Sequence, residues 1–245
     1  MTSIRKSAYM LFTRIPLPGA VKARLSPVLS PSQRASLQEA LVIDTVAKLL
    51  ELDGTVILCC SDEHQFVSDG HQLYDAFIRR VYDACTDSDA AQRLVTMQQR
   101  GNDLGNRMSN ALKDVLGKDA CTCLLLGSDL PYITPSDITV AERLLDDADV
   151  VFGPSPDGGY WLVGMKKPFP ELFAYEQYGR GDVLEHALEI CKRHDKKVAF
   201  APPSSDVDVP QDYKQLRKQV IAGDERIGLH TKQVIANLVG EATGV

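Results

Sequence analysis

Short apolar segments alternate along the chain with longer stretches in which apolar and polar residues follow a helical period. Each apolar segment ends at glycine, proline or a polar cluster, which is typical of strands buried on both faces of a parallel sheet. Ser30-Pro31 and Thr134-Pro135 place a capping residue before proline, so both predict helix starts. We therefore expect an α/β fold. The predicted strands cover residues 7–13, 55–60, 94–97, 121–126, 149–154 and 197–201. One predicted helix runs from Ser30 to about residue 52, a second from the turn at 101–108 to about residue 116, and a third from Thr134 to about residue 147. Three more are predicted over residues 183–194, 210–220 and 231–238.

The strand of residues 121–126 runs into Gly127-Ser128-Asp129, which places Asp129 at its carboxyl end. In an open parallel sheet, this is the edge at which ligands bind. A carboxylate at the mouth of an apolar strand is well suited to hold a divalent cation. The simpler alternative is that Asp129 shapes a turn or caps the next helix. The neighbouring motifs favour the first interpretation, so we expect Asp129 to be a metal ligand and a catalytic residue.

A loop rich in proline and cations follows the first strand. It carries Arg14, Gly19, Lys22 and Arg24. Cations beside exposed backbone N–H groups at the ligand edge can hold a diphosphate, because each charge-assisted hydrogen bond contributes about 1.5 to 3 kcal/mol. Three solvated surface cations are an equally good interpretation from spacing alone. The hypothesis is that these four residues bind nucleotide phosphates.

Asp103 and Arg107 lie one helical turn apart, in a segment whose glycines suit a turn close to a ligand. We predict that both residues bind the nucleotide or its phosphates. The alternative is that they pair with each other.

Asp157-Gly158-Gly159 predicts a sharp reversal, because glycine accepts positive φ angles. The β-prone residues after it are then expected to return antiparallel to the preceding strand, as a plain hairpin. The functional interpretation is that the glycines bring the backbone close to a ligand. Asp157 is then a catalytic residue that faces sugar hydroxyls, and Gly158, Gly159, Tyr160 and Trp161 bind the substrate.

A second acidic cluster, Asp206-Val207-Asp208, follows the last predicted strand. Alternate residues of an extended chain point in opposite directions. We therefore expect one carboxylate to reach the cation and the other to cap the helix that begins at Pro210. Asp208 is the preferred metal ligand and Asp206 the fallback. If Asp129 and Asp208 share a metal, asparagine at either position should weaken cation binding and leave the melting temperature unchanged or raised.

The composition of the chain limits the kinds of partner that we expect the protein to bind. The chain has 245 residues, 44% of them hydrophobic, which is ample for one domain over residues 1–245 with a helical tail from about residue 223. The formal charge of -6 argues against nucleic acid or an anionic membrane as the main partner. No apolar run is long enough to span a bilayer, and the N-terminus does not resemble a signal peptide. The six cysteines lie mostly in apolar segments, so we expect reduced thiols and a cytoplasmic location.

Taken together, these motifs resemble those of the uncharacterised DUF2064 family, whose members are similar to nucleotide-diphospho-sugar transferases of the glycosyltransferase-A type. The resemblance implies a three-layer, Rossmann-like sandwich with a mostly parallel sheet and one antiparallel strand after Gly159. The wider superfamily includes guanylyltransferases. The resemblance further implies that Asp129 binds the metal that bridges nucleotide phosphates, and that Lys22 and Arg24 contact those phosphates. The motifs that carry the resemblance are Leu11-Phe12-Thr13-Arg14, Pro18-Gly19, Lys22-Ala23-Arg24-Leu25, residues 103–108, residues 127–131, Gly153-Pro154, residues 157–161 and residues 206–208.

We therefore predict a transferase that acts on a nucleotide or nucleotide sugar and depends on Mg²⁺ or Mn²⁺, the cations that oxygen-only ligands favour. Glycosyl transfer is preferred, because a loop with the single Gly19 suits a diphosphate better than a triphosphate. Nucleotidyl transfer with release of pyrophosphate is the first alternative. A non-catalytic nucleotide-binding protein is the second, favoured by Ala23, where the family has threonine, and by Gly179-Arg180-Gly181. The acceptor and the oligomeric state are left open.

Overall fold

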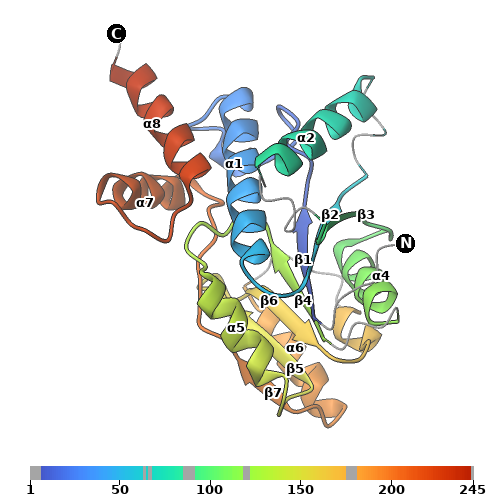
Figure 1. Cartoon of the computed structure of the whole chain (residues 1–245). Helices are drawn as coiled ribbons and strands as arrows, with labels where there is room; N and C mark the ends of the chain where they lie inside the picture. The colour runs from blue at the N-terminus through green and yellow to red at the C-terminus, as the bar shows by residue number, and fades with distance from the viewer. Residues whose placement is uncertain are drawn as a thin grey trace.

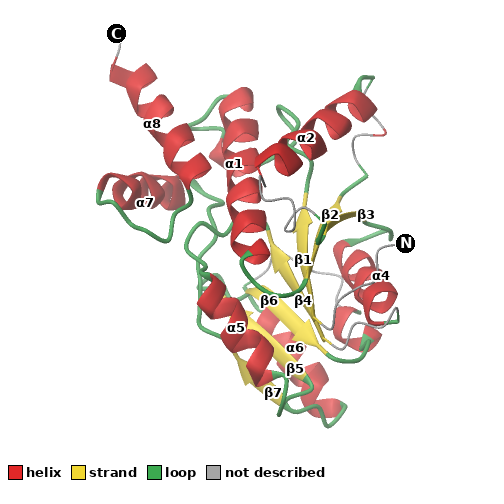
Figure 2. Cartoon of the chain, in the orientation of Figure 1, coloured by secondary structure: helices red, strands yellow, loops and turns green. Residues whose placement is uncertain are grey.

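The computed structural model describes residues 7–62, 65, 68–84, 92–117, 122–174 and 181–243, and Figures 1 and 2 show a sheet with helices on both faces. The strands are β1 (Ser7–Thr13), β2 (Thr55–Cys60), β3 (Leu94–Gln98), β4 (Thr122–Gly127), β5 (Val150–Pro154), β6 (Tyr160–Met165) and β7 (Val198–Phe200). They form one seven-stranded sheet in the order β3-β2-β1-β4-β6-β5-β7. Only β6 runs antiparallel to its neighbours, β4 and β5. The predicted mostly parallel sheet with one antiparallel strand is confirmed.

The helices match the predicted pattern closely. Ser30 caps α1 through the Gln33 backbone N–H, and Thr134 caps α5 through that of Asp137, so both predicted helix starts are confirmed. Residues 64–89, where no clean period was present, contain α2, and the rest of that segment lies largely outside the described residues. The helices are α1 (Pro31–Leu50), α2 (Gly70–Ala84), α4 (Leu104–Leu116), α5 (Pro135–Leu144), α6 (Val183–Arg193), α7 (Pro210–Ile221) and α8 (Leu229–Thr243), with short 3-10 helices η1 (Ala23–Leu25) and η3 (Pro170–Phe173).

The strand β1 shows how the three layers are held together. All seven of its residues are buried, and alternate side chains point to opposite faces. Tyr9 and Leu11 join a core cluster with residues of α1, α2 and α5. Met10 and Phe12 join the cluster on the other face, formed with α4, η3 and α6. The sheet is therefore sandwiched between two helical layers, as the sequence predicts.

The C-terminal helices pack against the outer part of α1 (Figure 1). Asp44, a buried residue of α1, accepts hydrogen bonds from the backbone N–H of His230 (3.1 Å) and of Thr231 (2.8 Å) at the start of α8. A carboxylate at a helix N-terminus satisfies unpaired N–H groups and interacts favourably with the helix dipole. Asp44 therefore fixes α8 to α1. None of the described helices is both long and apolar enough to cross a membrane.

Asp44→Ala should lower the free energy of unfolding by about 2 kcal/mol, because the start of α8 loses its cap. Urea denaturation measures the loss, and hydrogen exchange should show faster exchange in residues 229–243. Glu39→Ala is the matched control on α1, since Glu39 pairs with the half-exposed Arg80 at the surface. It should cost less than about 1 kcal/mol. Equal losses in the two variants would contradict the role of Asp44.

Candidate functional site

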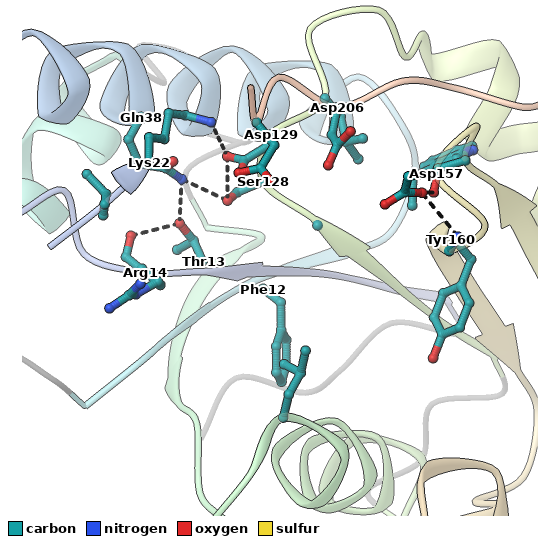
Figure 3. Close-up of a pocket in the computed structure, with 18 of the residues that line it drawn as sticks. Phe12, Thr13, Arg14, Lys22, Gln38, Ser128, Asp129, Asp157, Tyr160 and Asp206 are labelled. Atoms are coloured by element: carbon teal, nitrogen blue, oxygen red, sulfur yellow. Dashed lines mark hydrogen bonds and ion pairs between the residues drawn. The ribbon is translucent and has the colours of Figure 1, made fainter. Parts of the chain in front are cut away.

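The order of the strands reverses between β1 and β4, since β2 and β3 lie on one side of β1 while β6, β5 and β7 lie beyond β4. A crevice forms at the carboxyl ends of two such strands because their loops diverge. A cavity of about 760 Å³ opens here, within the size range of small-molecule sites (Figure 3). Its walls come from the ends of β1 and β4, the β1–α1 loop, the β5–β6 turn and the loop after β7.

Lys22 links three of these walls from inside the protein. Its backbone is left-handed (φ 47°), and its side chain is only 1% exposed. The ammonium Nζ lies 2.9 Å from Asp129 Oδ1 and donates to the carbonyl of Val207 at 2.9 Å. Lys22 therefore ties the β1–α1 loop to the end of β4 and to the loop after β7. It orients Asp129 and neutralises the charge of that carboxylate.

Gln38 holds the ends of β1 and β4 together. It lies on α1, is 3% exposed, and donates from Nε2 to Ser128 Oγ at 2.8 Å. The same Nε2 lies 3.4 Å from Thr13 Oγ1, and Ser128 Oγ lies 3.5 Å from Asp129 Oδ1. Gln38 was not among the predicted site residues. The available signal was a polar residue inside the apolar stripe of a long helix.

Gln99 makes a similar junction at the end of β3. Its Nε2 donates to the carbonyls of Thr13 (3.1 Å) and Cys59 (2.9 Å), and the side chain lines the cavity. This residue was not predicted either, although its place at the carboxyl end of a predicted strand was a usable signal.

Four carboxylates line the cavity, and three of them belong to residues far apart in the sequence: Asp129 after β4, Asp157 in the β5–β6 turn and Asp206 after β7. In Figure 3, Asp206 lies between the other two. Asp157 Oδ1 accepts hydrogen bonds from Ser155 Oγ (2.5 Å) and from the backbone N–H of Gly159 (3.1 Å). These bonds fix the Asp157 carboxylate on its turn. The site thus brings together three acidic residues that are distant in sequence.

The carboxyl group of Asp206 has a raised pKa. Burial is the main cause that raises its pKa to about 6, and the negative charge of Asp157 is the next. Asp129 and Asp208 raise the pKa further. The folded protein therefore holds this carboxylate at a cost in free energy, which a bound cation would offset.

Asp206→Asn should raise the free energy of unfolding at neutral pH by about 1 to 2 kcal/mol. Since the pKa is about 6 in the folded state and 3.8 for an unperturbed aspartate side chain, the folded protein binds more protons between these values. Stability then falls as pH rises through this window and stays lower above it. Asparagine does not ionise, so the variant should lack that fall. Urea denaturation at several pH values across this window measures the fall in stability, with substitution of the exposed Asp146 by Asn as control. The same dependence of stability on pH in Asp206→Asn and the unmodified protein would contradict the raised pKa of Asp206.

Asp208 also lines the cavity, but it pairs with Arg24, whose Nη1 lies 2.8 Å from Asp208 Oδ2. Both side chains are substantially exposed. Helix α7 is capped by Asp212, whose Oδ2 accepts the backbone N–H of Asp208 (3.0 Å) and of Val209 (2.8 Å). The expectation that Asp206 or Asp208 caps this helix is therefore wrong. A carboxylate at the third helical position reaches back to these groups instead.

Arg14, Gly159, Tyr160 and Trp161 also line the cavity. The ring of Tyr160 lies 5.2 Å from that of Phe152. Trp161 is 4% exposed and donates from Nε1 to the carbonyl of Pro202 at 3.0 Å. Tyr160 is thus the more accessible of the two aromatic residues.

Four predicted site residues lie outside the cavity lining: Gly19, Asp103, Arg107 and Gly158. Asp103 caps α4 by accepting the Asn106 N–H at 2.7 Å. Arg107 forms an ion pair with Asp62 at 3.4 Å, and its backbone N–H donates to the Asp103 carbonyl at 3.0 Å. Gly158 has φ 85°, and a Cβ there would lie 2.0 Å from the Gly181 carbonyl oxygen, so the turn itself requires glycine. Gly179 and Arg180 lie outside the described residues.

Within the described residues, no group of three or more His, Cys, Asp or Glu side chains could hold a metal ion. Magnesium is commonly bound by one or two carboxylates, with water and substrate phosphates as the other ligands. Asp129 and Asp206 fit that pattern, because both line the cavity and the charge of one raises the pKa of the other. The residues present therefore suit a cation that binds together with a phosphate-bearing ligand.

The chain is similar to several known proteins. Residues 67–180 match the model of a family described as "Uncharacterized protein conserved in bacteria (DUF2064)". The chain is 25% identical over 199 residues to the 2-phospho-L-lactate guanylyltransferase of Methanocorpusculum labreanum, a match that covers 80% of this chain and 76% of that protein. It is similar to the structure of a protein from Desulfovibrio desulfuricans, provisionally named a nucleotide-diphospho-sugar transferase, with 26% identity, a TM-score of 0.80 and coverage of 96% and 97%. A cytidylyltransferase from Leptospira borgpetersenii shares the fold, with 14% identity, a TM-score of 0.55 and coverage of 96% and 93%.

The fold and its relatives define the class: an α/β protein of the nucleotide-diphospho-sugar transferase type, with relatives named as transferases. The predicted class of enzyme is thereby confirmed. The predicted resemblance to DUF2064 is confirmed as well, since the family model matches residues 67–180.

Proposed function

We propose that the protein transfers a group from a nucleotide-activated substrate bound in the switch-point cavity. The observation that carries this proposal is the meeting of Asp129, Asp157 and Asp206 in one cavity that Arg14 and Arg24 also line. Guanidinium groups bind phosphate through charge-assisted hydrogen bonds, and carboxylates hold the cation that phosphates require. The two Arg side chains are therefore assigned to the phosphates.

A divalent cation, Mg²⁺ or Mn²⁺, belongs to this proposal. Asp129 and Asp206 would hold it, with Asp208 as a further candidate. When bound, such a cation neutralises charge on the phosphate leaving group. Lys22 keeps Asp129 in place through the 2.9 Å ion pair, and Gln38 keeps Ser128 beside it. These residues preorganise the site before the substrate arrives.

Charge favours a diphosphate donor and thus glycosyl transfer from a nucleotide sugar. The described lining carries three cationic side chains, Arg14, Lys22 and Arg24, and four acidic ones. Lys22 is already paired with Asp129, and Arg24 with Asp208. A triphosphate brings about twice the charge of a nucleotide sugar into this acidic cavity, and Coulomb repulsion grows with that charge. In this proposal, Asp157 and Tyr160 contact the sugar.

Nucleotidyl transfer with release of pyrophosphate is the second candidate. The guanylyltransferase of Methanocorpusculum labreanum, whose match covers 80% of this chain, is the observation that favours it. Both reactions use the same cation and the same basic groups, so the donor is the point of difference.

Titration calorimetry with nucleoside diphosphates, triphosphates and nucleotide sugars, with and without Mn²⁺, tests the proposed donor class. We expect cation-dependent binding, tighter for nucleotide sugars than for triphosphates. Tighter binding of triphosphates would move the assignment to nucleotidyl transfer. Absence of any cation-dependent binding would contradict both candidates.

We also keep the proposal of a reducing, cytoplasmic environment, because Cys59, Cys60, Cys123 and Cys191 are free and buried.

A further inference from the structure

A second cavity of about 460 Å³ shares one wall residue, Asp206, with the switch-point cavity. It lies between the start of α5, one face of α7 and the loop after β7. Its polar lining includes Tyr132, Ser204, Gln215 and Gln219. The proposed donor site does not use any of these four residues.

Two residues of this lining have a buried hydroxyl group without a hydrogen-bond partner in the described part of the chain. Tyr132 Oη and Ser204 Oγ have no hydrogen-bond partner among the described residues. The backbone N–H of Ser204 donates to the Pro154 carbonyl at 3.1 Å, which fixes the loop and leaves the hydroxyl unused. Unpaired buried polar groups are few in folded proteins, and ordered water or a ligand is a common partner for them.

Further hydrogen-bonding groups surround these hydroxyls. Gln215 and Gln219 lie one turn apart on α7, so both amides are on the same face. Asp137 and Asp212 use Oδ2 to cap their helices. Each carboxylate keeps a second oxygen for other donors. The cavity thus offers amides, hydroxyls and carboxylates, which are the groups that bind sugar and polyol hydroxyls.

The charge of the lining disfavours acidic ligands. Asp137, Asp206 and Asp212 contribute negative charge. Arg226 is the cationic residue in the described lining, and two of its nitrogens bind the Asp224 carboxylate, at 3.0 and 2.7 Å. A phosphate or carboxylate would enter against like charges, whereas a neutral molecule would not.

We propose that the second cavity binds the acceptor of the transfer and that this acceptor is a neutral, hydroxyl-rich molecule such as a sugar or polyol. The assignment of an acceptor role rests on the proposed function. Because Asp206 lies in both walls, an acceptor here borders the donor site. In the transfer, the bond between the sugar carbon and the diphosphate oxygen breaks, and a bond from that carbon to the acceptor oxygen forms. The proton of the acceptor hydroxyl is released to solvent.

Saturation-transfer NMR with glucose and glycerol as neutral probes tests the cavity, with glucose phosphate and glycerol phosphate as their acidic counterparts. We expect at least one neutral probe to bind and its phosphorylated counterpart not to bind. Replacing both Gln215 and Gln219 by leucine should weaken that binding at least about tenfold, since each lost hydrogen bond lowers affinity. Gln211→Leu, an exposed residue of α7 outside this cavity, is the matched control and should bind like the unmodified protein.

Two smaller substitutions separate binding from folding. Ser204→Ala and Tyr132→Phe each remove a hydroxyl that has no partner within the described residues. We expect an unchanged or higher melting temperature without ligand, together with weaker binding of the neutral probe. Unchanged probe binding in both variants would overturn the proposal.

Nucleotide titrations on the same samples distinguish this inference from the proposed function. Nucleotide binding without binding of any neutral probe, or with preference for the phosphorylated probes, would overturn the acceptor assignment and leave the donor site intact. Binding of a neutral probe by a protein that binds no nucleotide would instead overturn the proposed transferase function and, with it, the acceptor role.

Discussion

Asp129→Ala is expected to abolish cation-dependent nucleotide binding and to destabilise the protein. The Asp129 carboxylate both lines the cavity and neutralises the Lys22 ammonium 2.9 Å away. Its removal leaves an ammonium that is 1% exposed without a counter-charge, which should cost about 3 kcal/mol of unfolding free energy. Titration calorimetry with Mg²⁺ and a nucleotide should show affinity lower by at least about 100-fold, or about 2.7 kcal/mol.

Asp208→Ala is the matched control for the effect on stability. It breaks an ion pair with Arg24 in which both side chains are more than a third exposed, so it should cost less than about 1 kcal/mol. This difference revises the expectation from sequence that loss of Asp129 spares the melting temperature, because the buried partner Lys22 was not foreseen. Equal stability in the two variants would contradict the assignment of Asp129 to a buried pair.

Lys22→Met should have the second largest effect. The variant keeps most of the buried stem but removes the donor to the Val207 carbonyl and the partner of Asp129, so we expect a loss of about 3 kcal/mol in unfolding free energy. Since the ammonium also repels a cation near Asp129, the variant should bind Mg²⁺ more tightly. Thermal unfolding with increasing Mg²⁺ should therefore show a larger rise in melting temperature for the variant than for the unmodified protein.

Lys48→Met offers a control at a lysine that is partly buried. Lys48 Nζ donates to the carbonyl of Pro131 at 2.9 Å, and Lys48 does not line the switch-point cavity. Burial lowers its pKa to about 8. The control should lose stability without any added response to Mg²⁺. A larger Mg²⁺ response at Lys48 than at Lys22 would contradict the proposed place of the cation.

The fold was predictable from sequence because its strands are short, apolar and buried on both faces. The segment that ends at Thr13 and the segment before Asp129 needed no knowledge of their neighbours to be recognised as strands. The meeting of their carboxyl ends at one edge also followed, since parallel strands present their carboxyl ends on the same side of a sheet. Asp129 was identified for the same reason, as the carboxylate that directly follows a buried strand.

The partners within the site were not predictable, because they depend on contacts between distant segments. Lys22 has the local signature of a phosphate ligand, yet it adopts a left-handed backbone and donates to Val207, 185 positions along the chain. The choice between Asp206 and Asp208 depended on how the loop after β7 crosses the end of β4, where the Val207 N–H donates to the Asp129 carbonyl at 3.0 Å. No local period encodes that crossing.

The most direct test of the proposed function is phosphorus NMR of the protein incubated with a panel of nucleotide sugars, Mg²⁺ or Mn²⁺, and the neutral acceptors that bind the second cavity. The proposal predicts release of the nucleoside diphosphate, dependent on the cation and absent in Asp129→Ala. Unchanged nucleotide sugars across the panel, alongside pyrophosphate released from a nucleoside triphosphate, would contradict glycosyl transfer. Release of neither product, with nucleotide still bound, would contradict the assignment of this site to a transferase.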